Sequence, residues 1–184
     1  MAQPKHIELR PVDHVTTDAI GPPGQRVFYI LGAKDDQVIS VIVEKFQVQT
    51  LAVGVEQFLA EVNTKFPDLP AASADYEEEK MKIHPPVEAL FRVGQVGLGF
   101  DAEADLVALE LREGVAGEGQ EAEAEAEESE DQAVVRLWCT RSQIRALVNW
   151  GLEVANRGRP LCPQCGQPMD PEGHFCQRKN GHKL

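Results

Sequence analysis

Four side chains close together in the C-terminal part of the chain have the residue types and the spacing of a metal site. Cys162 and Cys165 form a Cys-x-x-Cys pair, and His174 and Cys176 follow shortly after it. A structural zinc ion takes four thiolate or imidazole ligands in a tetrahedron. Three of the four cysteines of the chain fall in this stretch. The pattern therefore predicts one structural Zn²⁺ ligated by Cys162, Cys165, His174 and Cys176.

The fourth ligand stays open between two histidines. His174 and Cys176 are two positions apart, so in an extended segment both side chains point to one face, and we favour His174. His182 is the alternative, although it stands third from the end of the chain, where fraying is usual. A redox Cys-x-x-Cys pair is the alternative to a metal site. Such a pair opens a helix after a strand, whereas Gln167-Pro168 would break a helix here.

The net charge of −12 is concentrated in one segment of the chain. Residues 113–131 hold nine acidic side chains and no Lys or Arg, and removing these charges leaves −3 for the rest. Such a segment has too few apolar groups to offset the entropy of ordering, and its like charges repel one another. We expect residues 113–131 to be a disordered acidic insert. A transient helix rich in Ala and Glu is the alternative.

The C-terminal stretch is locally basic on this acidic chain. Between 157 and 184 the acidic side chains are Asp170 and Glu172. The basic side chains of the same stretch are Arg157, Arg159, Arg178, Lys179 and Lys183. Nucleic-acid binding through this stretch is open but not favoured, because phosphate backbones repel a strongly acidic protein at long range.

Neither a membrane span nor a signal peptide is expected. The chain has no run of about 18 apolar residues. Residues 1–6 lack the apolar core of a signal peptide. We therefore expect a cytoplasmic protein, and in a reducing compartment clustered cysteines are more often metal ligands than disulfides.

Apolar periodicity predicts an α+β domain that would position this tail. β-branched runs separated by a glycine-containing turn predict a hairpin, and apolar stripes of period 3.6 predict two long helices. Thr140 or Ser142 is the expected N-cap of the second helix. The expected strands are 6–10, 12–20, 26–31, 38–43, 90–100, 106–111 and 133–139, the apolar helical stripes span 48–62 and 144–155, and a short surface helix is expected at 75–80.

The order β-β-β-α occurs twice, over about 5–66 and about 90–157. Moving the residue numbers by 96 places Val38-Ile39 on Val134-Val135, and a shift of 80 matches the residues upstream. The acidic insert accounts for the difference of 16 residues between the two shifts. We interpret this as an internal duplication whose two units pack about a pseudo-two-fold axis into one antiparallel-sheet core. A chance match is the alternative, since any two strand–helix units share apolar spacing.

The predicted organisation is a duplicated α+β domain over 1–158 followed by a zinc-binding tail over 159–184. Residues 67–90 are expected to connect the two halves. A chain of 184 residues is long enough for one well-buried core with a small module attached.

The tail motif Cys162-Pro-x-Cys-Gly-x-Pro-x-Asp-Pro-x-Gly-His-x-Cys-x-Arg-x-Asn-Gly181 resembles the end of a bacterial family known as domain of unknown function 3090. The segment from Val27 through Val48 is similar to the first hairpin and helix of that family. The likeness covers most of the chain apart from the acidic insert. It implies a repeat architecture, in agreement with the duplication, and it implies no activity.

No constellation of catalytic residues stands out in the sequence. Residues 97–102 match a loose G-x-G-x-x-A, but a turn and a strand are expected there instead of the helix that a dinucleotide site needs. Cys139 falls on a predicted strand, which favours a buried packing role. We therefore expect a non-enzymatic zinc-containing protein that docks an unidentified protein partner through its zinc knuckle and basic tail. The alternatives are an enzyme with a pocket between the two repeats and a purely structural zinc, or nucleic-acid binding through the tail.

Overall fold

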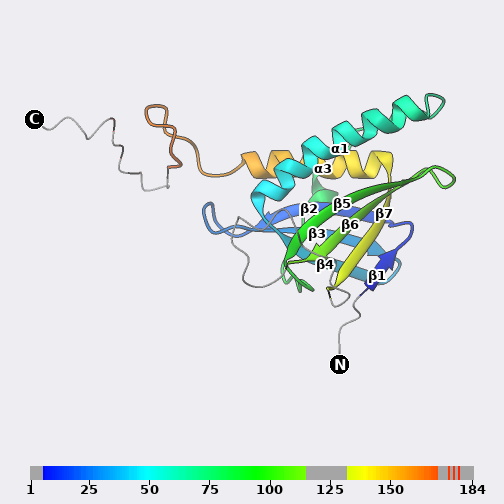
Figure 1. Ribbon diagram of the computed structural model, residues 1–184. Coiled ribbons are helices and arrows are strands. Elements are labelled where there is room, and N and C mark those ends of the chain that lie inside the picture. Colours follow the sequence, from blue (N-terminus) through cyan, green and yellow to red (C-terminus); the bar gives the residue numbers. More distant parts are fainter. Residues whose placement is uncertain (1–5, 115–131, 170–173, 175, 177, 179–184) are drawn as a thin grey trace, which may run out of the picture.

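The computed structural model describes residues 6–114, 132–169, 174, 176 and 178, and these form an α+β fold (Figure 1). The described elements, in chain order, are β1 (His6–Leu9), β2 (His14–Ile20), β3 (Val27–Lys34), β4 (Gln37–Val43), α1 (Lys45–Lys65), α2 (Glu78–Met81), β5 (Val93–Asp101), β6 (Leu106–Glu113), β7 (Val134–Thr140) and α3 (Arg141–Asn156). Each predicted strand and helix has a counterpart among them. β6 extends to Glu113, the first residue of the predicted acidic insert, and residues 115–131 lie outside the described residues.

Two sheets form the body of the molecule. One is the antiparallel meander β2-β3-β4, and the other has the order β1-β7-β6-β5. Strands β5, β6 and β7 pair antiparallel, whereas β1 pairs in parallel with β7. The expectation of antiparallel pairing throughout is therefore wrong for β1. The meander of the first half forms without β1, and β1 instead pairs with the edge of the other sheet, where Leu9 lies opposite Leu137 and is buried.

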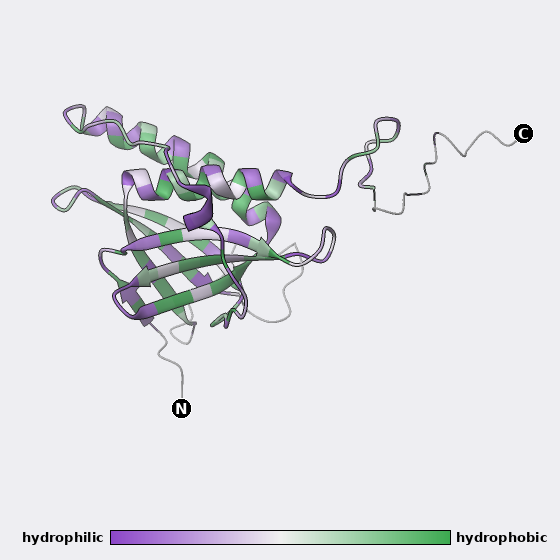
Figure 2. Cartoon of the chain, turned by 180° about the vertical axis from the view of Figure 1, so that it is seen from behind, coloured by the Kyte–Doolittle hydropathy of each residue, from purple (hydrophilic) through white to green (hydrophobic). Residues whose placement is uncertain are grey.

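The helices α1 and α3 lie side by side over the sheets and share one core with them (Figure 1). Each helix carries its apolar stripe on the inner face, and apolar residues run along the strands beneath (Figure 2). Both halves of the chain contribute to this core, so neither sheet folds around a separate interior. The largest fully buried side chains are Leu9, Ile30, Val41, Val48, Val55, Val107, Leu109, Leu111, Leu137, Ile144, Leu147 and Trp150.

Both long helices begin with the same capping arrangement. The amide of Thr140 donates to Gln143 Oε1 at 2.8 Å, and Thr140 Oγ1 accepts from the Gln143 amide at 3.1 Å. At the start of α1 the amide of Glu44 donates to Gln47 Oε1 at 2.7 Å. These bonds satisfy amides that the helix cannot pair internally. Thr140, one of the two predicted caps of α3, is therefore the N-cap residue.

The same two glutamines also tie each helix to the opposite half of the chain. Gln47 Nε2 donates to the carbonyl oxygen of Val93 at 3.0 Å, at the start of β5. Gln143 Nε2 donates to the carbonyl oxygen of Asp13 at 3.2 Å, just before β2. The two contacts are reciprocal, because each helix of one half reaches the first residues of the meander of the other half. They hold α1 and α3 in register with both sheets.

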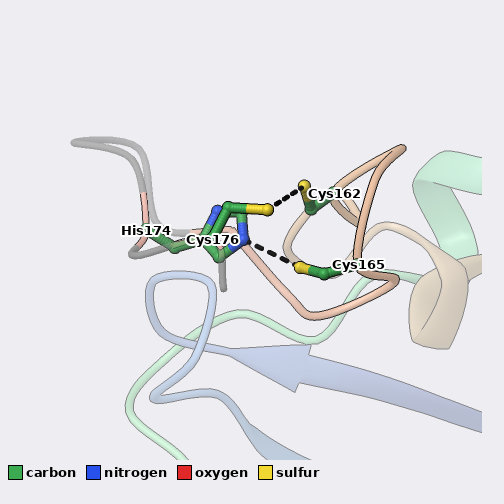
Figure 3. A group of neighbouring side chains, drawn as sticks. All are labelled: Cys162, Cys165, His174 and Cys176. Atoms are coloured by element: carbon green, nitrogen blue, oxygen red, sulfur yellow. Dashed lines mark hydrogen bonds between the residues drawn. The ribbon is translucent and has the colours of Figure 1, made fainter. Parts of the chain in front are cut away.

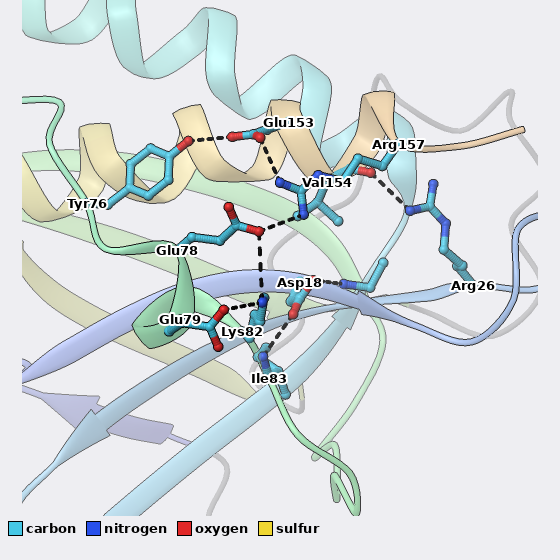
Figure 4. A network of polar contacts seen from close by, with 11 residues as sticks. Asp18, Arg26, Tyr76, Glu78, Glu79, Lys82, Ile83, Glu153, Val154 and Arg157 are labelled. Atoms are coloured by element: carbon cyan, nitrogen blue, oxygen red, sulfur yellow. Dashed lines mark hydrogen bonds and ion pairs between the residues drawn. The ribbon is translucent and has the colours of Figure 1, made fainter. Parts of the chain in front are cut away.

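The predicted connector runs along α3 and reaches the core through a buried cation. Arg141, only 5% exposed, donates to Asp105 Oδ1 at 2.7 Å and to the carbonyl oxygen of Pro70 at 2.7 Å. Farther along, Tyr76 Oη donates to Glu153 at 2.6 Å. These contacts fix the connector against the helix, and Figure 4 shows the bond from Tyr76 to Glu153. Within the described part of the chain, no helix is long and apolar enough to cross a membrane.

Candidate metal centre

The Cys-x-x-Cys pair lies in a tight hairpin immediately beyond α3. Leu161 and Pro168 form an antiparallel bridge, and the amide of Cys162 donates to the carbonyl oxygen of Gln167 at 2.8 Å. The amide of Gly166 donates back to the carbonyl oxygen of Cys162 at 2.8 Å. Gly166 has a φ of +72°, a left-handed conformation that glycine adopts without a Cβ clash. The turn therefore presents the two cysteines on one side of a closed loop.

His174 and Cys176 face this hairpin from the segment that follows it (Figure 3). The four ligand atoms, three Sγ and one imidazole nitrogen, all lie within 4.8 Å of one another. The Sγ atoms of Cys162 and Cys176 are 3.8 Å apart, and Cys165 Sγ lies 3.1 Å from His174 Nε2. The structure thus brings together all four residues that the sequence predicts as metal ligands. His182, the alternative ligand, lies outside the described residues.

The spacing of the sulfur atoms suits a tetrahedral ion better than a disulfide. Zn–S bonds of about 2.3 Å place two sulfurs about 3.8 Å apart along a tetrahedral edge. The separation of Cys162 Sγ from Cys176 Sγ has this value. A disulfide requires about 2.05 Å. Thiolate and imidazole ligands favour zinc among the common divalent metals, so the donor set fits Zn²⁺.

Backbone amides prepare the first cysteine for metal binding. The amides of Cys165 and Gln164 donate to Cys162 Sγ and lower the pKa of this thiol to about 7. The amide of Gln167 lowers the pKa of Cys165 as well, but burial and the neighbouring Cys162 and Cys176 sulfurs outweigh it, and the net shift is upward. Crowded thiols resist simultaneous ionisation in this way unless a cation stands between them, and a divalent ion supplies that charge.

The side chains of the cluster are largely shielded from solvent. Cys162 is 7% exposed and Cys176 4% exposed, while Cys165 and His174 are half-buried. Arg178 donates to the carbonyl oxygen of Gln164 at 2.9 Å and so links the segment after Cys176 to the hairpin. This bracing role of Arg178 was not foreseen from the sequence, which indicated only a basic side chain near the site.

The remaining chemical candidates lie apart from this cluster. Cys139 sits on β7 in the core, where burial raises the pKa of its thiol to about 12, and its predicted packing role is confirmed. Residues 97–102 belong to β5 and the turn after it, so no helix opens at the loose glycine motif. Among the described residues, the cluster of three cysteines and His174 is the one group arranged to hold a metal ion.

Comparison with known proteins gives one match. The family described as "Protein of unknown function (DUF3090)" matches residues 7–176. The chain belongs to this family. The DUF3090 match includes all four residues of the cluster as well as both sheets and both long helices. No curated protein and no solved structure matches the chain.

Proposed function

We propose that the tail of this DUF3090 protein, residues 159–184, is a structural zinc knuckle, and that the protein is a non-enzymatic binding module that docks a protein partner through it. The observation that carries the proposal is the convergence of Cys162, Cys165, His174 and Cys176 within 4.8 Å. A site with four protein ligands leaves no open position for a substrate, so the ion would supply shape to a short segment. The role requires a reducing compartment such as the cytoplasm, since the thiols must stay unoxidised.

The proposed docking face lies at the base of the knuckle. Leu161, directly before the first cysteine, is 64% exposed, an unusual position for a large apolar side chain next to a closed site. Arg178 brings a positive charge to the same module. Covering an exposed apolar side chain is favourable, and arginine is enriched in protein interfaces, so both side chains support docking through this module.

Nucleic-acid binding through the tail receives less support. The first basic side chain of this stretch is Arg157, whose guanidinium donates to Glu153 at 2.7 Å and to Glu78 at 3.2 Å (Figure 4). It also lies 4.8 Å from the centre of the Trp150 ring. A cation already paired with two carboxylates gains little from a phosphate backbone. Lys179 and Lys183, two further basic side chains of the stretch, lie outside the described residues.

We also propose that the two halves of the domain descend from one β-β-β-α unit. The reciprocal contacts of Gln47 with Val93 and of Gln143 with Asp13 support this reading. The two donors, Gln47 and Gln143, differ by the shift of 96 that aligns the sequence, and the two acceptors, Asp13 and Val93, differ by the shift of 80. Matching side-chain bonds at equivalent positions favour a duplication over a chance likeness between two strand–helix units.

Zinc content tests the metal part of the proposal. Native mass spectrometry of the purified protein should show one zinc per chain. Cys165→Ser should lose the ion and the order of the tail while the sheet domain keeps its thermal transition, because the core lies outside the knuckle. Cys139→Ala is the matched control: it removes a cysteine outside the cluster and should retain the zinc. A wild-type chain that folds fully without metal would refute the proposal.

Partner capture tests the docking part. Wild type, Cys165→Ser and Cys139→Ala are used as baits under identical conditions. A partner retained by wild type and by Cys139→Ala, but lost with Cys165→Ser, supports docking through the ordered knuckle. The same partners on all three baits would place the binding face elsewhere on the molecule.

A further inference from the structure

A pocket of about 430 Å³ lies where the base of the tail meets the start of α1. Its walls come from both halves of the chain and from the tail. Four of its lining residues are cationic, namely Arg26, Lys45, Arg92 and Arg159, and one, Glu44, is acidic. We propose that this pocket binds a small phosphate-bearing ligand, of the class of a nucleoside monophosphate.

Two of the cations, Arg26 and Lys45, lie close together in the pocket. Glu44 is committed to Arg92, with which it forms an ion pair. A Cβ placed on Gly158 would lie 3.2 Å from Arg26 Nη2 and 3.4 Å from Lys45 Nζ, so these nitrogens are separated by no more than the sum of the two distances. Two cations this close repel each other, and a phosphate between them would relieve the repulsion and accept bonds from both.

Arg26 is held in place for such a contact. Its Nη1 donates to the carbonyl oxygen of Val154 at 3.0 Å, in the last turn of α3 (Figure 4). Its guanidinium carbon also lies 5.3 Å from the centre of the Phe28 ring. The side chain is therefore positioned by the helix and the ring before any ligand arrives, which reduces the entropy lost on binding.

Lys45 stands at the N-terminal end of α1, where the helix dipole is unfavourable to a cation. It is the first residue of α1, where the helix dipole favours acids, and the first turn of α1 contains none. Arg141 occupies the same position in α3, but there Asp105 neutralises the charge at 2.7 Å. Among the described residues Lys45 has no carboxylate partner. Its Nζ lies 3.4 Å from the position of a Cβ on Gly158, just past the C-terminal end of α3, where the helix dipole favours a cation. The ammonium is therefore held at the pocket without a carboxylate that would neutralise it.

The remaining walls suit an apolar group attached to the phosphate. Val27 and Phe28 from β3, together with Leu161 and Pro168 from the tail, line the pocket beside the cations. The volume is in the range of small-ligand sites, about 300–1,000 Å³. A long polyanion is disfavoured, because the net charge of −12 repels it at long range while a small ligand is affected little.

Calorimetric titration of the full-length, zinc-loaded protein tests the proposal with three probes: AMP, inorganic phosphate and adenosine. The expected order of affinity is AMP first, phosphate weaker and adenosine weakest, with the AMP affinity falling as NaCl is raised. This order separates the contribution of the phosphate from that of the base. The zinc content is measured on the same sample, so loss of the metal and loss of phosphate binding are distinct results.

Lys45→Glu and Lys65→Glu form a matched pair at the two ends of α1. Both make the same change in net charge, but only Lys45 lines the pocket. Lys45→Glu should weaken AMP binding about tenfold or more, the loss expected for a bond to a charged group. Its melting temperature should not fall, since an acid at this helix end is favourable. Lys65→Glu should leave the AMP affinity unchanged.

Three results would overturn the proposal. One is the absence of AMP and phosphate binding by the wild-type protein. A second is an equal effect of the two lysine variants, which would mean that the net charge alone governs binding. The third is binding of a single-stranded oligonucleotide without binding of AMP. Lys45→Gln serves as a second variant if the charge reversal prevents folding.

Discussion

The contact between the two halves can be tested at one glycine in the middle of α3. An added Cβ at Gly151 would lie 2.7 Å from Thr17 Cγ2 on β2 and 2.8 Å from Val48 Cγ1 on α1. Ordinary contacts between carbon atoms are about 3.5–4.0 Å. Both neighbours are β-branched and buried, and Thr17 Oγ1 is fixed by donating to the Tyr29 carbonyl oxygen at 2.8 Å. Gly151→Ala should therefore strain the core.

The size of the effect follows from two opposed contributions. Overpacking a well-filled core costs about 1–3 kcal/mol. Replacing a mid-helix glycine by alanine stabilises the helix by about 1 kcal/mol. Because two rigid neighbours are contacted at once, we take the upper part of the first range and expect a net loss of about 1–2 kcal/mol.

Gly54→Ala is the matched control. Gly54 lies in the middle of α1, and an added Cβ there meets nothing within 4 Å. The same substitution should therefore stabilise the protein by about 1 kcal/mol. For a chain of this size the two variants should differ in melting temperature by about 5–10 °C. Circular dichroism during heating, with zinc present throughout, measures the difference.

One result would refute this reasoning. If Gly151→Ala is as stable as Gly54→Ala, α3 does not pack tightly against β2 and α1. The two halves would then meet loosely, contrary to a shared core. A parallel fall in both variants would instead show that alanine is unfavourable in these helices for a reason other than contact.

Two further predictions concern charged pairs in the sheet domain. Asp105→Asn should lower the free energy of unfolding by about 2 kcal/mol, because it leaves Arg141 without a carboxylate partner. Asp35→Asn is the control, because Asp35 is also a turn residue with nearly the same positive φ, and it should change the free energy of unfolding little. Urea denaturation measures both variants, and equal losses would count against the pairing of Asp105 with Arg141. Hydrogen bonds first from Arg136 and then from Arg112 lower the pKa of Glu110 below its unfolded value. The two arginines therefore stabilise the folded protein fully above the pKa that Glu110 has in the unfolded chain, and this stabilisation is lost as the pH falls through the lower pKa of the folded protein. Between pH 6 and pH 3, wild type should lose about 1 kcal/mol more free energy of unfolding than Glu110→Gln. Identical pH profiles of the two proteins would contradict this prediction.

Local interactions explain why so much of the fold could be predicted from the sequence. The hairpin of β3 and β4 follows from two β-branched runs joined by a short turn, and α1 and α3 follow from apolar stripes of period 3.6. The cap at Thr140 is a contact three residues away. The cysteine pair is also local, because two residues between the sulfurs suffice to bring both to one ion.

Contacts between distant segments were decided only by the tertiary structure. The alternation of β1 indicates a strand, but its pairing with β7 depends on which sheet has an edge free. Arg26, Lys45 and Arg159 are far apart in the sequence, and none belongs to a motif; they meet because β3, α1 and the tail converge at one pocket. Periodicity and spacing record what a residue does within its own turn or strand. Packing of the two halves around one core sets which surfaces coincide, and no short-range pattern encodes that.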